Sequence, residues 1–227
     1  MISLLKEQLG IRAAAVVNHT LRDVAAINLD EVDWKNPRAG EKSRDSSQTP
    51  EERALFFRLK DEIIASEDAA IERAGLGPGN GDMVTGKGGH WDWDGTGYDG
   101  PRYGIFSIWR PWETVKRDPL ALMATPESDL QFAILPRTYK DRKGHVKEYY
   151  SENPLVRVPK EGQVHEWWYL SEQSPEEVYA IKFYDSEGLR RGDGSVRMMC
   201  PHSAFTIEGT EDAPARRSSE LRIWCIW

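Results

Sequence analysis

Apolar and polar positions follow helical spacing near the start of the chain and strand spacing after about residue 100. The apolar residues of Ile2 to Leu9 recur at the intervals of a short helix, which Gly10 is expected to end. Ala13 to Val17 is a continuous apolar run, the pattern of a buried strand. The chain therefore begins with a helix followed by a strand.

A second, longer helix is predicted over residues 50–73. Thr49 can cap it, Pro50 suits its first position, and Glu52 completes a capping box. We expect it to run to about Arg73 and to flank the β-structure. Its buried side is expected to contain Leu55, Phe56, Leu59, Ile63 and Ile64.

The remainder of the chain, from residue 89 to 227, has the pattern of short strands separated by turn residues. The expected strands are Tyr103 to Trp109, Leu130 to Leu135, Val164 to Leu170, Val178 to Tyr184, Val196 to Cys200 and Ser218 to Trp227. Many short strands after a helical start are typical of a barrel or jelly roll with helices packed outside. We predict one domain over residues 1–227, mainly β with flanking helices (α+β), whose barrel core spans 89–227.

Composition narrows the class of protein. The net charge of -7 and the pI near 5.4 argue against nucleic acid as the partner. No run of 18 apolar residues and no signal-peptide pattern is present, so neither a membrane span nor export is expected. Two cysteines make no disulfide framework, which fits a reducing cytoplasm.

Two polar segments are expected to border the site. Lys35 to Gln48 contains few apolar residues and is predicted to be a mobile loop, and the glycine-rich Gly75 to Gly89 leads directly into His90. Such segments beside a metal site often act as lids that order when substrate binds. The alternative is an ordinary surface loop.

His90 and Asp92 are the first candidates for chemistry. Residues two apart in a strand point the same way, so this pair presents an imidazole and a carboxylate on one face. With His202 they would form the two-histidine, one-carboxylate triad that leaves positions open on Fe(II). Asp94 shares the strand face but lies one pair farther along, so Asp92 is the preferred ligand.

The other histidines and one cysteine have simpler interpretations. His145 lies in a turn, His165 is expected to support a strand or pocket, and His19 to be a hydrogen-bonded structural residue. Cys200, two residues before His202, is interpreted as a small buried residue rather than a ligand.

Arg216 is the candidate for binding the far carboxylate of a 2-oxo acid by a bidentate contact. It follows His202 by fourteen residues, and Glu208 to Pro214 is expected to form the turn of a hairpin that returns Arg216 to the level of the metal on the adjacent strand. Ser218 faces the same way and can add a hydroxyl donor. Arg222 is the competing arginine, and its simpler role is a structural ion pair.

Aromatic residues are numerous near the predicted site, with nine tryptophans in the chain. Most are expected in the core, but some are expected to wall a pocket for an apolar or aromatic substrate. Trp109 is placed beside the cosubstrate. The candidate substrate contacts are Asn18, Arg22, Trp91, Trp168 and Tyr169.

Several of these motifs together resemble one family, that of the fungal aspergillic-acid-type hydroxylase/desaturases and the cephamycin methoxylation proteins. The segments that carry the resemblance are Val17–Arg22, Gly89–Asp92, Ile108–Pro111, Asp118–Leu122, Tyr179–Ser186, Pro201–Phe205 and Arg216–Arg222. The segment from His202 to Ser218 also resembles the wider 2-oxoglutarate oxygenase pattern. The resemblance implies a double-stranded β-helix (jelly-roll, cupin-like) that binds Fe(II), 2-oxoglutarate and O2.

The function expected from the resemblance is oxidation of a C–H bond of a small natural-product-like molecule, by hydroxylation, desaturation or ring formation. A cupin-like iron enzyme that uses the same triad without 2-oxoglutarate is the alternative, as an isomerase, cyclase or dioxygenase. A non-catalytic barrel binding protein is a second alternative, and zinc hydrolysis a weaker one. Family members usually carry a further N-terminal segment, so a partner subunit covering an open sheet edge, in a homo-oligomer, is left open.

Overall fold

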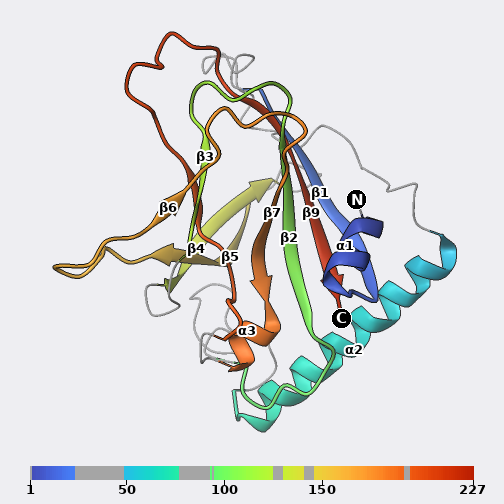
Figure 1. Ribbon diagram of the computed structural model, residues 1–227. Helices are drawn as coiled ribbons and strands as arrows, with labels where there is room; N and C mark the ends of the chain where they lie inside the picture. Colours follow the sequence, from blue (N-terminus) through green and yellow to red (C-terminus); the bar gives the residue numbers. More distant parts are fainter. Residues whose placement is uncertain are drawn as a thin grey trace.

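Two β-sheets pack face to face and two of the helices cover the larger sheet (Figure 1). The computed structural model describes residues 2–23, 49–76, 93, 95–124, 130–140, 146–191 and 195–227, with the backbone alone at 2, 4, 17–23, 131–140 and 147–154. Among these residues, helix and strand are mixed, as the predicted α+β class requires. None of the described helices combines the length and the apolar character needed to cross a membrane.

The larger sheet has four antiparallel strands, which Figure 1 shows side by side. Its order is β1 (Ala13–Asp23), β9 (Arg217–Ile226), β2 (Tyr103–Pro111) and β7 (Tyr179–Asp185). β2 is therefore paired on both sides, with β9 and with β7.

The smaller sheet has three short strands, and a separate hairpin makes a third sheet. The order in the smaller sheet is β6 (Trp167–Trp168), β3 (Leu120–Met123) and β8 (His202–Ala204). The hairpin pairs β4 (Leu130–Lys140) with β5 (Val146–Val156). From β6 onward the chain alternates between the small and the large sheet at every strand.

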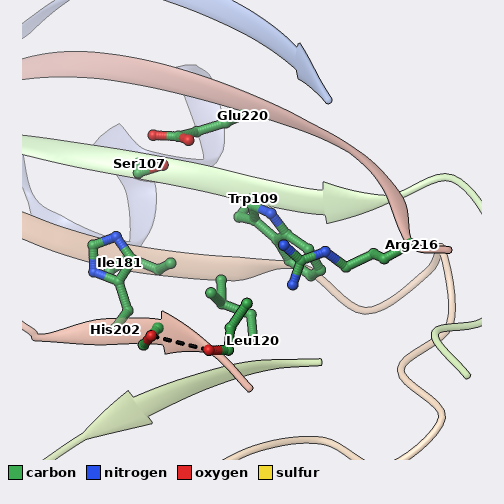
Figure 2. Close-up of a pocket in the computed structure, with 9 residues that line it drawn as sticks. Ser107, Trp109, Leu120, Ile181, His202, Arg216 and Glu220 are labelled. Atoms are coloured by element: carbon green, nitrogen blue, oxygen red, sulfur yellow. Dashed lines mark hydrogen bonds between the residues drawn. The ribbon is translucent and has the colours of Figure 1, made fainter. Parts of the chain in front are cut away.

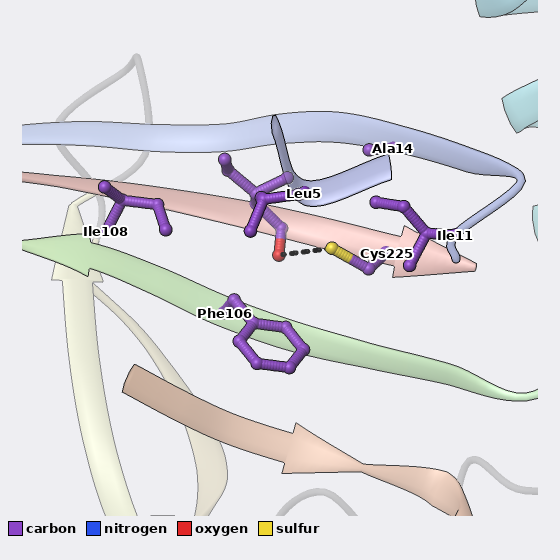
Figure 3. Close-up of a cluster of buried hydrophobic side chains, with 7 residues drawn as sticks. Leu5, Ile11, Ala14, Phe106, Ile108 and Cys225 are labelled. Atoms are coloured by element: carbon purple, nitrogen blue, oxygen red, sulfur yellow. Dashed lines mark hydrogen bonds between the residues drawn. The ribbon is translucent and has the colours of Figure 1, made fainter. Parts of the chain in front are cut away.

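One face of the large sheet packs against α1 (Ile2–Leu9) and the residues that follow it. Figure 3 shows Leu5 and Ile11 over Phe106 of β2 and Cys225 of β9, all buried. The helix ends as predicted at Gly10, whose φ of +65° suits glycine. Burial raises the pKa of the Cys225 thiol to about 12, so this thiol is an apolar core residue.

The opposite face of the large sheet is shared by α2 (Pro50–Arg73) and the small sheet. α2 places its buried side chains against β1 and β9, and Phe56 meets the Trp224 ring edge-on with centroids 5.7 Å apart. Toward the other end of β2 and β9, Leu120 of β3 packs on Trp109 and Ile181. The gap between the two sheets at this end is where the candidate site lies.

The predicted boundaries of α2 are confirmed. Thr49 Oγ1 accepts a hydrogen bond from the Glu52 N–H at 3.2 Å, and Glu52 Oε2 accepts one from the Thr49 N–H at 3.1 Å. This capping box satisfies backbone donors that the first turn leaves unpaired. The burial of Ile64 was predicted wrongly, because it is 41% exposed while the adjacent Ile63 faces the sheet.

Two of the predicted later strands were wrong or incomplete, and three later elements were not predicted. No strand forms over Val196–Cys200, where the Met198 backbone lies so close to Gly188 that a Cβ atom on that glycine would be 2.6 Å from it. Val164–Leu170 contributes only the two residues of β6. The strands β3 and β5 and the helix α3 (Ser186–Arg191) were not predicted from the sequence.

A buried ion cluster holds the end of β7 beside the start of β2. The Asp185 side chain is fully buried, accepts two hydrogen bonds from the Arg102 guanidinium at 3.0 and 2.6 Å, and accepts one from Lys182 Nζ at 2.9 Å. Burial raises the pKa of the Asp185 carboxyl, but these hydrogen bonds outweigh burial and hold its pKa below the ordinary value. The carboxylate therefore stays ionised inside the protein.

We predict that Asp185→Asn destabilises the fold by about 3 kcal/mol at pH 7, because both cations lose a buried partner. Since the folded-state pKa lies below the unfolded value of about 3.9, this stability is present above that value and is lost as the pH falls through the folded-state pKa. Urea unfolding of the wild type and the variant at several pH values measures it. Glu113→Gln, at the exposed ion pair with Arg217, is the control and should cost under about 1 kcal/mol; an equal loss in the two variants would contradict the prediction.

Candidate active site

A cavity of about 220 Å³ lies between the two sheets (Figure 2). Strands β2, β7 and β9 contribute lining residues on one side of the cavity, and β3 and β8 contribute them on the other. Its lining residues are Ser107, Trp109, Leu120, Ile181, His202, Ser203, Ala204, Arg216 and Glu220. Two of the residues predicted from sequence as metal or cosubstrate contacts, His202 and Arg216, lie at opposite ends of this cavity in Figure 2.

His202 is the first residue of β8 and lies opposite Leu122 of β3. Its Nδ1 atom is 3.0 Å from the backbone carbonyl oxygen of Cys200. Because a carbonyl oxygen only accepts, Nδ1 carries the proton in this hydrogen bond and Nε2 keeps its lone pair. The arrangement leaves His202 with one nitrogen suited to binding a metal ion.

Arg216 lies immediately before β9 and is held from two directions. Its Cζ atom lies over the Trp109 ring, 5.2 Å from the centroid, and its Nη1 donates a hydrogen bond to the Asp118 carbonyl oxygen at 2.6 Å. Trp109 is itself stacked on Tyr179, with ring centroids 5.8 Å apart. These contacts hold a guanidinium cation at one end of the cavity.

The predicted hairpin between His202 and Arg216 was wrong. β8 pairs with β3, whereas β9 pairs with β1 and β2, so the two residues belong to different sheets. Arg216 therefore does not lie beside His202 on a neighbouring strand. The chain leaves the small sheet after β8 and enters the large sheet at β9, which places the arginine at the far end of the cavity.

Ser218 and the competing Arg222 have different surroundings from Arg216. Ser218 lies opposite Pro111, is fully buried and does not line the cavity. Arg222 Nε is 2.9 Å from Glu220 Oε1, and its Cζ lies over the Phe183 ring, 4.7 Å from the centroid. Arg222 is thus engaged in an ion pair within β9.

Sequence reasoning missed two polar lining residues. Ser107 is fully buried, and its Oγ has no hydrogen-bond partner within the described part of the chain. Glu220 is 5% exposed and is the ion-pair partner of Arg222. The two-residue alternation of strands relates Ser107 to Trp109 and Glu220 to Ser218, and this pattern could have identified both.

The other candidates predicted from sequence lie away from the cavity or outside the described residues. Trp168 lies opposite Leu122 and is 63% exposed, while the half-exposed Tyr169 meets Phe205 edge-on; neither lines the cavity. The β1 backbone places Asn18 opposite Arg222, and Arg22 opposite Ser218. Candidates outside the described residues are His90, Trp91, Asp92 and Asp94, the loop 35–48 and most of 75–89.

Within the described part of the chain, the cavity lining contains one histidine, His202, and one carboxylate, Glu220, which is paired with Arg222. No group of three or more His, Cys, Asp or Glu side chains suited to a metal ion occurs in that part of the chain. Burial raises the pKa of the half-buried Cys200 thiol, which favours the protonated form over the thiolate that metals bind. Of the three predicted metal ligands, His202 alone lies in the described part of the chain.

Comparison with known proteins assigns the family. The family model described as an oxidoreductase/YMDC permease-like domain matches residues 96–226, more than half of the chain, and the chain belongs to this family. The matched span includes Trp109, His202, Arg216 and Ser218 and begins after Asp92.

Three curated fungal relatives are similar to the chain. The oxidoreductase chry3 of Gibberella zeae is 31% identical over 56% of this chain and 42% of that protein. The hydroxylase/desaturase efuI of Hormonema carpetanum is 35% identical over 56% of this chain and 41% of that protein. The alpha-ketoglutarate-dependent dioxygenase phiK of a fungal species is 32% identical over 56% of this chain and 42% of that protein. The chain spans less than half the length of each. Among solved structures, the iron and alpha-ketoglutarate-dependent endoperoxidase NvfI is similar to the chain, with a TM-score of 0.48 and 20% identity over 99% of this chain and 66% of that chain.

We predict that neutral His202 is the Nδ1–H tautomer, because its hydrogen bond to the Cys200 carbonyl requires that proton. NMR of histidine-labelled protein, with the His202 signal assigned by its loss in His202→Gln, measures the tautomer. A predominantly Nε2–H ring would contradict the geometry.

Proposed function

We propose that this chain is a non-haem Fe(II)- and 2-oxoglutarate-dependent oxygenase that acts on a C–H bond of a small natural-product-like molecule. The observation that carries the proposal is the cavity with His202 at one end and the Arg216 cation at the other. The names of the similar fungal hydroxylase/desaturase and dioxygenase support the same chemistry. Whether the reaction is hydroxylation, desaturation or ring formation depends on the substrate.

We infer that the domain is a double-stranded β-helix, with the two sheets as its walls. The alternation of β6, β7, β8 and β9 between the small and large sheets supports this topology. The α1 and α2 helices lie outside or across the end of the large sheet. In this interpretation the cavity is the interior of the barrel and one domain spans residues 1–227.

His90, Asp92 and His202 are the proposed metal ligands. A lone pair on His202 Nε2 fits an iron site, because imidazole nitrogen is a preferred ligand of Fe(II) and the other nitrogen is already hydrogen-bonded. Together these residues would supply two nitrogens and one carboxylate oxygen. Fe(II) bound there, with 2-oxoglutarate and O2, supplies the oxidising power for breaking a C–H bond.

Arg216 and Trp109, which line the cavity, and Ser218, which lies outside its lining, are the proposed cosubstrate contacts. The fit of a 2-oxo acid is supported by the charge at the Arg216 end of the cavity and by a volume that accommodates a small dicarboxylate. Arg216 would bind and orient the far carboxylate, and Trp109 holds the guanidinium in place. The apolar side chains of Leu120 and Ile181 exclude water from the same space.

The remaining proposals concern the substrate contacts, the cellular location and the partners. Asn18, Arg22, Trp91, Trp168 and Tyr169 are proposed to contact the substrate. The exposed aromatic rings of Trp168 and Tyr169 support an apolar or aromatic partner molecule. A cytoplasmic location is proposed because both cysteines are free thiols, and neither nucleic acid nor a membrane is proposed as a partner. A homo-oligomer is left open.

We predict that His90→Ala, Asp92→Ala and His202→Ala each abolish tight Fe(II) binding and leave the protein folded. Anaerobic Fe(II) titration, with circular dichroism as the folding control, measures the effect. Asp94→Ala is the matched variant and should retain stoichiometric iron. Iron retained in Asp92→Ala but lost in Asp94→Ala would reverse the carboxylate assignment.

We predict that Arg216→Met weakens 2-oxoglutarate binding by about 2 kcal/mol, roughly thirty-fold in Kd, because a buried carboxylate loses its charged partner. Titration at saturating Fe(II) under anaerobic conditions measures it through the visible charge-transfer band of the chelate. Arg222→Met, at the same saturation, is the matched control. A larger cosubstrate defect at Arg222 would reverse the assignment, and iron binding with no response to 2-oxoglutarate would favour the cupin-like alternative.

A further inference from the structure

We propose that Phe183 and Arg222 are positioning residues that fix the ring plane of His202, whose Nε2 would bind the metal. The inference rests on the proposed function, since it assigns His202 as a metal ligand. The Phe183 and His202 rings are stacked, with centroids 4.9 Å apart and planes inclined by 22°. The Arg222 Cζ atom is 4.7 Å from the centroid of the same Phe183 ring.

His202 needs a second contact because its own strand holds it weakly. β8 has only three residues, and His202 is exposed. The hydrogen bond from Nδ1 to Cys200 fixes the direction of one ring atom, but a single hydrogen bond leaves the tilt of the ring plane free. A stacked aromatic ring restricts that tilt, so Phe183 supplies the missing constraint.

The backbone of β7 is irregular at Phe183. In the pairing with β2, Ile105 lies opposite Tyr184 and Phe106 lies opposite Lys182, so Phe183 is an extra residue with no partner across the ladder. Such a β-bulge turns a side chain away from the regular alternation and is frequent beside active sites. Here it coincides with the residue that reaches His202 from the opposite sheet.

The residues on either side of Phe183 are anchored, which keeps the bulge in place. Lys182 Nζ donates a hydrogen bond to the buried Asp185 carboxylate at 2.9 Å and to the Arg197 carbonyl oxygen at 3.1 Å. The Tyr184 hydroxyl is 3.4 Å from that of Tyr103, and the two rings pack with centroids 5.4 Å apart. Phe183 therefore projects from a fixed piece of backbone.

Arg222 of β9 restrains Phe183 of β7 across the intervening strand β2. Its guanidinium is held by Glu220, at 2.9 Å, and Glu220 is 5% exposed. A cation over an aromatic face is attracted to that ring. The series Glu220, Arg222, Phe183 and His202 thus runs from β9 through β7 to β8 and joins the large sheet to the small one.

Three other residues, none of which lines the cavity, have the same kinds of contact and serve as a matched control for this series. Arg217 Cζ lies over the Trp112 ring, 4.9 Å from its centroid, and Arg217 Nη1 is 3.1 Å from Glu113 Oε1. This trio has the same chemistry, a cation between an aromatic ring and a carboxylate, but none of its members lines the cavity. Substitutions in the two trios remove similar interactions at different places.

The test compares Phe183→Leu, Phe183→Tyr and Arg222→Met with Trp112→Leu and Arg217→Met. The first measurement is the Kd for Co(II) alone, and the second is the NMR signal of the His202 ring in metal-free protein, assigned with His202→Gln. We expect Phe183→Leu to weaken Co(II) binding about ten-fold, the size usual for groups that orient metal ligands, and to remove the ring-current shift of His202. Phe183→Tyr should restore both values, and Arg222→Met should weaken Co(II) binding about three-fold.

Stability is measured in parallel by urea unfolding, because a merely structural role would change stability and leave both other readouts unaltered. Trp112→Leu and Arg217→Met should keep the wild-type Kd for Co(II). A Phe183→Leu protein with wild-type Kd, or a Trp112→Leu protein with an equal loss, would overturn the inference. If Phe183→Leu does not fold, Arg222→Met decides by the same two readouts. A wild type that binds no Co(II) would overturn the proposed function itself.

Discussion

The pairing of β2 with β9 is the constraint on which the core and the cavity both depend. In this register Ser107 lies opposite Arg222 and Trp109 opposite Glu220, so all four share one face of the sheet. The residues between them, Ile108 and Leu221, and the next pair, Phe106 and Ile223, share the other face and pack against α1. A slip of one residue would exchange the two sets, placing an ion pair in the α1 core and apolar side chains in the cavity. The burial of Ile223 and Cys225 therefore also fixes the position of the polar cavity residues.

The crossing of the chain between the sheets explains why neighbours in sequence act at opposite ends of the cavity. β8 ends at Ala204 and β9 begins at Arg217, but the two strands pair with different partners, so His202 and Arg216 approach the cavity from different walls. Separation of this kind suits a ligand with two polar ends, since one residue can reach each end. A hairpin, as the sequence alone had suggested, would have placed both residues on one wall.

Local patterns made α1 and α2 predictable, whereas the strands of the small sheet depend on contacts that no local pattern records. Capping by Thr49 and the left-handed backbone of Gly10 act within a few residues, and the predicted helix ends match the structure. β3 and β8 have only a few residues each, too few for alternation to be recognised, and exist because they pair with each other.

The candidate site also contains both kinds of residue, those that a local pattern predicts and those that depend on strand pairing. His202 and Arg216 were identified from residue type and spacing, and the structure places both on one cavity. Phe183 was not identified as a site residue, because its role follows from a bulge that only the pairing of β2 with β7 reveals. The two-residue alternation of the strands could have identified Ser107 and Glu220, but neither residue belongs to a recognisable motif.

The two arginines of the β9 region show how one strand can supply different electrostatic functions. Arg222 is held beside Glu220, and a paired cation and carboxylate present little net charge to a ligand. Arg216 is held by the Trp109 ring and by the carbonyl oxygen of Asp118, and both contacts leave its positive charge in place. The aromatic ring beside each guanidinium fixes its position. The two arginines thus differ in what their positions allow: Arg216 lies at the end of the cavity, where the proposed cosubstrate would bind, and Arg222 contacts the ring of Phe183.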